Sequence, residues 1–126
     1  MTAPSIRTIG AVAAACLGVP EYDVFGENRE KRTVFARRVA MFVAARHHPR
    51  EHTKIGRALG NRTRTVVQRS LEDIAGRLDE PVIADAVSRV GRVVDTLVQA
   101  QPDAQRTAEL IRGLRAANAN KHGELA

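Results

Sequence analysis

The sequence has one cysteine, few aromatic residues and no long hydrophobic run, and each scarcity excludes a class of protein. A single cysteine, Cys16, cannot form an internal disulfide, so a disulfide-stapled secreted scaffold is not expected. Charged residues interrupt every apolar run well before the roughly 20 residues that a membrane span needs. The N-terminal residues also lack a signal-peptide pattern. We therefore expect a cytoplasmic protein without a membrane partner.

Aromatic side chains make up only 3% of the chain, whereas the hydrophobic share is an ordinary 44%. That share consists chiefly of alanine, valine, leucine and isoleucine, which favours the packing of helices against helices. A chain of 126 residues fits one domain and can bury more than half of its unfolded surface in a single core. We therefore expect one compact unit that needs no disulfide or metal for stability.

Basic charge is concentrated in the middle of the chain. The formal net charge is +6 at pH 7. Residues 27–77 contain 13 Lys or Arg against 5 Asp or Glu, so the remainder is slightly acidic. Such a cluster favours a polyanionic partner, which could be nucleic acid, an acidic membrane or an acidic protein. Taken alone, the cluster is explained as well by a solvated surface without a partner.

Apolar residues recur at helical spacing along most of the chain and predict an all-α fold. The predicted helices span about residues 6–16, 29–47, 51–59, 64–78, 81–98 and 104–117. Residue types that favour helix N-caps stand before four of them, at Ser5, Asn28, Thr63 and Asp103. We expect residues 21–26 to form a loop and residues 118–126 to form a flexible tail.

A short helix, a tight turn and a longer helix follow one another between residues 51 and 78. Gly60 and Asn61 tolerate the left-handed backbone that ends a helix abruptly. Gly56 would allow the two helices to cross closely. This order is typical of a helix-turn-helix, which places the DNA-binding region in residues 1–78. Residues 79–117 then form a C-terminal helical extension, which completes the same unit or mediates dimerisation.

The start of the second helix of a helix-turn-helix faces the major groove of double-stranded DNA. Arginine can bond two acceptors on guanine, and the threonine methyl group can pack on the methyl group of thymine. Exposed helix-end side chains without a DNA contact are the alternative for each position. The DNA-contacting residues predicted from this pattern are Arg62, Thr63, Arg64, Thr65, Gln68 and Arg69. Arg38 and Lys54, outside this helix, are expected to support the contact with the DNA backbone.

Three separated segments resemble the C-terminal DNA-binding domain of the bacterial replication initiator DnaA. Residues 36–43 read ARRVAMFV, where the family has a motif like ARQIAMYL. An Ile-Gly pair follows at residues 55–56, and residues 60–67 read GNRTRTVV, where the family has a signature like GGRDHTTV. The resemblance covers residues 6–78. It implies that Arg37 enters the minor groove and that Arg62 supports a base or phosphate contact.

The sequence departs from this family where DNA specificity is determined. Thr63 and Arg64 replace the family's Asp-His pair, and Val66 replaces its second threonine. We therefore do not expect the usual initiator site as the target. A Gly-rich phosphate loop ending in Lys-Ser or Lys-Thr is also missing, so neither an ATPase nor a nucleotide cofactor is expected.

The sequence thus predicts a sequence-specific double-stranded DNA-binding protein, acting as a transcriptional or replication regulator at the nucleoid. No catalytic site and no cofactor are expected. A metal site is not expected either, because Pro49 interrupts the helical spacing of His47, His48 and His52 and no cysteine lies nearby. The alternative is a protein-interaction module that uses the apolar stripe of residues 82–98. The same stripe suggests a homodimer, although it could instead be buried within one chain.

Overall fold

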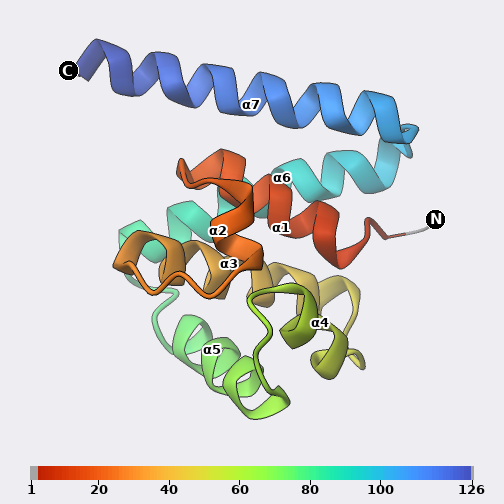
Figure 1. Cartoon of the computed structure of the whole chain (residues 1–126), viewed down its shortest axis with the longest axis vertical. Coiled ribbons are helices and arrows are strands. Elements are labelled where there is room, and N and C mark those ends of the chain that lie inside the picture. The colour runs from red at the N-terminus through yellow and green to blue at the C-terminus, as the bar shows by residue number, and fades with distance from the viewer. Residues whose placement is uncertain (1–2, 126) are drawn as a thin grey trace.

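The computed structural model describes residues 3–125, with the side chains of residues 3–119, and this part of the chain is all-helical. Its helices are α1 (Ile6–Leu17), α2 (Glu21–Phe25), α3 (Lys31–His47), α4 (His52–Ala58), α5 (Arg64–Gly76), α6 (Pro81–Ala100) and α7 (Ala104–Leu125). Figure 1 shows α4 and α5 at one end of the molecule and α7 at the other. Within the described residues, no helix combines the length and apolarity that crossing a bilayer requires.

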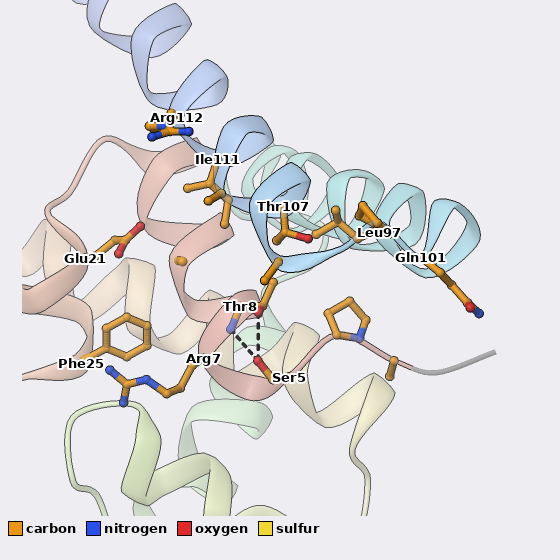
Figure 2. A pocket seen from close by; sticks show the side chains of 16 residues that line it. Ser5, Arg7, Thr8, Glu21, Phe25, Leu97, Gln101, Thr107, Ile111 and Arg112 are labelled. Atoms are coloured by element: carbon orange, nitrogen blue, oxygen red, sulfur yellow. Dashed lines mark hydrogen bonds between the residues drawn. The ribbon is translucent and has the colours of Figure 1, made fainter.

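Helix α1 lies at the centre of the core and packs against α2, α3, α6 and α7. Alanines make up much of its buried surface, which allows the surrounding helices to approach closely. Its ends agree with the sequence prediction: Ser5 Oγ accepts a hydrogen bond from Thr8 N (Figure 2), and Gly18 ends the helix in the left-handed conformation, with a φ of 71°.

Two local predictions are wrong. Residues 21–25 form the short helix α2, which Pro20 precedes and whose first turn carries the acidic Glu21 and Asp23. Negative side chains stabilise a helix N-terminus, and the prediction of a loop did not take this into account.

Asn28 does not cap α3: its side-chain oxygen accepts from Glu30 N, and the helix begins at Lys31. Residues 118–125 are helical and continue α7, while the flexibility predicted for this tail stays a prediction; Ala126 lies outside the described residues.

The apolar stripe of α6 is buried inside the chain. Its buried residues are Ile83, Ala86, Val87, Val90, Val94 and Leu97. Helix α6 packs against α1 and α3, and α7 packs against α1. The stripe is therefore not a free working surface, which removes the main argument for the protein-interaction module. The homodimer stays a prediction, since Leu110 on α7 remains 47% exposed.

Helices α4 and α5 form the predicted helix-turn-helix. Gly60 and Asn61 adopt left-handed backbone, with φ values of 92° and 52°. The turn returns directly onto α4, because Arg62 N donates to the carbonyl oxygen of Gly56 at 2.7 Å. A Cβ atom at Gly56 would overlap the carbonyl oxygen of Arg62. Gly56 therefore permits the close approach of turn and helix.

We expect Gly56→Ala to lower the free energy of unfolding by about 1–3 kcal/mol, because the added methyl group has to displace backbone. Gly76→Ala is the matched control, since nothing lies within 4 Å of a Cβ atom there. That substitution should raise stability by up to about 1 kcal/mol through helix propensity. Urea unfolding of both variants measures the difference, and equal effects would show that Gly56 is not required for the turn.

Candidate nucleic-acid interface

Helix α5 presents one polar, exposed face and buries the opposite one. Thr63 caps the helix, its side-chain oxygen accepting from Val66 N at 3.3 Å. The buried face carries Val67, Ser70 and Ile74. The predicted DNA-contacting residues on the outer face, all exposed, are Arg64, Thr65, Gln68 and Arg69. These side chains can hydrogen-bond to base edges or phosphates without rearrangement of the core.

Helix α5 is the second helix of the helix-turn-helix, here called the recognition helix. On one side of its start lie basic residues of α4 and of the loop before α4. Arg50, Lys54 and Arg64 line one cavity of about 630 Å³. Glu51 lies in the same cavity and accepts a hydrogen bond from Lys54 Nζ at 3.2 Å. This hydrogen bond lowers the pKa of the Glu51 carboxyl below its usual value. The structure thus brings Lys54 and Arg64 together, as a shared DNA contact would require.

Arg37 lies in the interior, on the buried face of α3. Only 3% of its surface is exposed, and its guanidinium group donates four hydrogen bonds to backbone carbonyls of α2 and the connection to α3. The acceptors are Val24 O, 3.0 Å from Nε, and Asp23 O, Gly26 O and Asn28 O, at 2.7, 2.9 and 3.0 Å from Nη2.

The same guanidinium group packs against the helix-turn-helix turn. A Cβ atom at Gly60 would lie only 2.6 Å from Arg37 Nε and 2.9 Å from Gly26 O. Burial, and secondarily the charge of Arg62, lower the pKa of Arg37 below its usual value, although an arginine remains charged at neutral pH. Arg37 therefore joins the connection before α3 to the turn before α5.

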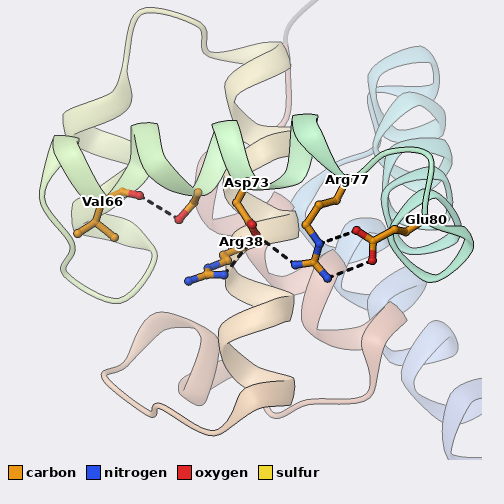
Figure 3. Close-up of polar contacts among 6 residues, drawn as sticks. Arg38, Val66, Asp73, Arg77 and Glu80 are labelled. Atoms are coloured by element: carbon orange, nitrogen blue, oxygen red, sulfur yellow. Dashed lines mark hydrogen bonds and ion pairs between the residues drawn. The ribbon is translucent and has the colours of Figure 1, made fainter.

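Arg38 and Arg62 lie on the other side of α5 from Lys54. Arg38 is exposed and forms an ion pair with Asp73 of α5 at 3.3 Å (Figure 3). Arg62 is half-buried in the turn and lines one cavity together with Arg37 and Arg38. Basic side chains thus stand on both sides of the recognition helix.

A family model described as the bacterial DnaA protein helix-turn-helix matches residues 6–74, more than half of the chain. The chain belongs to this family. Membership implies DNA binding through a non-catalytic fold and confirms the resemblance predicted from the three segments. A search of curated proteins found no match.

The expectation that Arg37 enters the minor groove of DNA stays a prediction, and the conformation described does not favour it. A guanidinium group bonded to four backbone carbonyls and 3% exposed does not project toward a ligand. The physical reason is the short helix α2, which the sequence prediction missed. Its C-terminal end supplies carbonyl acceptors at the position of the Arg37 side chain.

The prediction also omitted two basic residues, Arg29 and Arg50. Each lines a cavity beside α5 together with predicted site residues. Both belong to the basic stretch of residues 27–77, which is the only signal that would have indicated them.

Among the described residues, no group of three or more His, Cys, Asp or Glu side chains is placed to hold a metal ion.

We expect Arg37→Ala to lower the free energy of unfolding by roughly 2–4 kcal/mol, because one buried and three partly buried carbonyl groups lose their donor. Its exposed neighbour provides the matched control: Arg38→Ala should change stability by no more than about 1 kcal/mol. Urea unfolding without DNA gives both values. A stable Arg37→Ala protein with weakened binding to A·T-rich duplexes would instead restore the minor-groove role.

Proposed function

We propose that the chain recognises specific sites in double-stranded DNA and regulates transcription or replication at the nucleoid. The observation that carries this proposal is the exposed face of α5, on which Arg64, Thr65, Gln68 and Arg69 stand at the start of a recognition helix. A helix of this kind fits the major groove of B-DNA, which is about 12 Å wide. The membership of the DnaA-type family supports DNA as the partner.

The arrangement of charge around α5 also supports this mode of binding. A helix in the major groove lies between two phosphate backbones, so cations are useful on both of its sides. Lys54 and Arg50 stand on one side, and Arg38 and Arg62 on the other. In this proposal these four residues fix the position of the protein, while Arg64 and Gln68 read bases.

The target differs from the usual initiator site in this proposal. Arg64 occupies the second position of the family's Asp-His pair, where it offers a guanidinium fork suited to the two acceptors of guanine. Thr63 occupies the first position, and its side-chain oxygen already accepts the capping hydrogen bond from Val66 N. Thr63 is thus a neutral cap where the family has an acidic residue, and Arg64 is a cation where the family has a histidine. These two changes favour a different base sequence as the target.

Selection of duplexes from a random pool tests the proposal, with the wild-type chain expected to recover one defined motif. Arg64→Ala should lose about 1–3 kcal/mol on that motif and flatten the preference at one base pair. Arg112→Ala on α7, exposed at the opposite end of the molecule, makes the same change in charge and should leave the motif intact. An unchanged motif in the Arg64 variant excludes Arg64 as a base reader.

A further inference from the structure

A groove with mostly apolar walls separates α6 from α7, outside the residues that the family model matches. Its volume is about 780 Å³. Helix α7 packs against α1 and leaves its side toward α6 open, so that Leu110 in the wall of the groove is 47% exposed. The other apolar residues of the walls are Val93, Leu97, Ala100, Pro102, Leu114 and Ala117. Covering such a surface is favourable, because apolar area leaves water.

Gly113 leaves a gap in the wall that α7 contributes. Nothing lies within 4 Å of a Cβ atom built on Gly113, so the packing of this chain does not require a glycine there. Glycine in a helix interior is less stable than alanine. Ala117 follows one turn later in the same wall. Small residues on one side of a helix let a second backbone approach closely.

The groove also carries one positive and one negative side chain, Arg106 and Glu109 of α7. Both are exposed. Within the part of the chain whose side chains the structure describes, neither forms an ion pair, and Glu109 only accepts a hydrogen bond from Gln105 Nε2 at 3.4 Å. Since the two charges cancel, the groove does not select a strongly charged partner. It is complementary in charge to itself, turned about a two-fold axis.

We propose that this α6–α7 groove takes up α7 of a second copy of the chain, in an antiparallel two-fold pair. Each contact then occurs twice, and Arg106 of each copy faces Glu109 of the other. Pro102 and Gly113 are equally far along the chain from the point midway between Arg106 and Glu109. The register that pairs the charges therefore also places the connection at Pro102 of one copy over the gap at Gly113 of the other.

This pairing leaves the DNA-binding ends free. Helix α7 lies at the end of the molecule opposite to α4 and α5 (Figure 1). With α7 in the interface, neither recognition helix is covered, so one dimer can hold two duplexes at once. This consequence rests on the proposed function, whereas the pairing itself does not.

Sedimentation without DNA, from micromolar to millimolar concentration, tests the pairing. Arg106→Glu and Glu109→Arg each set like charges opposite one another, so each should raise the dissociation constant of the dimer by about tenfold or more. Mixed in equal amounts, the two variants should pair with each other about as tightly as the wild type, because every Glu then faces an Arg. Arg112→Glu makes the same reversal on α7 outside the groove and should change nothing.

Gly113→Leu fills the gap and gives a second, independent variant. It should weaken the dimer while it stabilises the helix of the single chain, because leucine favours a helix more than glycine does. A wild-type chain that stays monomeric at millimolar concentration overturns the inference. So does a dimer that neither charge reversal weakens, or a pair of charge variants that do not associate when mixed.

Capture of a second, differently labelled duplex by chain bound to an immobilised first duplex tests the consequence for DNA. The wild type should capture it, Arg106→Glu alone should not, and the mixture with Glu109→Arg should restore capture. Equal capture by all three contradicts bridging through this groove. A wild-type dimer that binds no duplex contradicts the proposed function and leaves the pairing intact.

Discussion

The interaction on which the DNA-binding end depends is the hydrogen bonding of the Arg37 guanidinium group to four backbone carbonyls. These carbonyls lie in α2 and in the connection to α3, where regular helical hydrogen bonding ends. Carbonyl groups that are buried or partly buried need donors, and a single planar guanidinium group supplies them here. The side chain also packs on Gly60. One residue therefore holds together the segment before α3 and the turn before α5.

This constraint determines what the surface of α5 presents. Because the turn is fixed by the bond from Arg62 N to Gly56 O and by the contact of Gly60 with Arg37, α5 leaves it in a defined direction. Val67 and Ile74 anchor the inner face of α5 in the core, so Arg64 and Gln68 remain exposed. Side chains held on a rigid helix lose less conformational freedom on binding than side chains on a loop.

Most of the fold follows from features that are local in the sequence. The caps at Ser5 and Thr63, the left-handed pair at residues 60–61 and the first-turn Pro81 fix helix ends through short-range geometry, so they could be predicted. The burial of the α6 stripe depends on which neighbour covers it. Apolar periodicity indicates that a face is buried, but it does not distinguish packing within one chain from packing between two chains.

The site was harder to predict than the fold, and Arg37 shows why. Arg37 and Arg38 are adjacent arginines of one helix, yet Arg37 is only 3% exposed, whereas Arg38 pairs with Asp73 at the surface. Arg37 lies on the buried face of α3 and Arg38 does not, and the carbonyl acceptors of Arg37 come from α2 and the connection to α3, where the sequence predicted a loop. The exposed positions of α5 were easier, because apolar residues at helical spacing, such as Val67 and Ile74, mark the inner face and hence the residues on the outer face.

A structure of the chain bound to its selected duplex tests most directly the claim that Arg37 positions the interface without touching DNA. The account predicts that the Arg37 guanidinium group keeps its bonds to Asp23, Val24, Gly26 and Asn28, while Arg64 lies in the major groove. An Arg37 side chain that has left these carbonyls and entered the minor groove would contradict it.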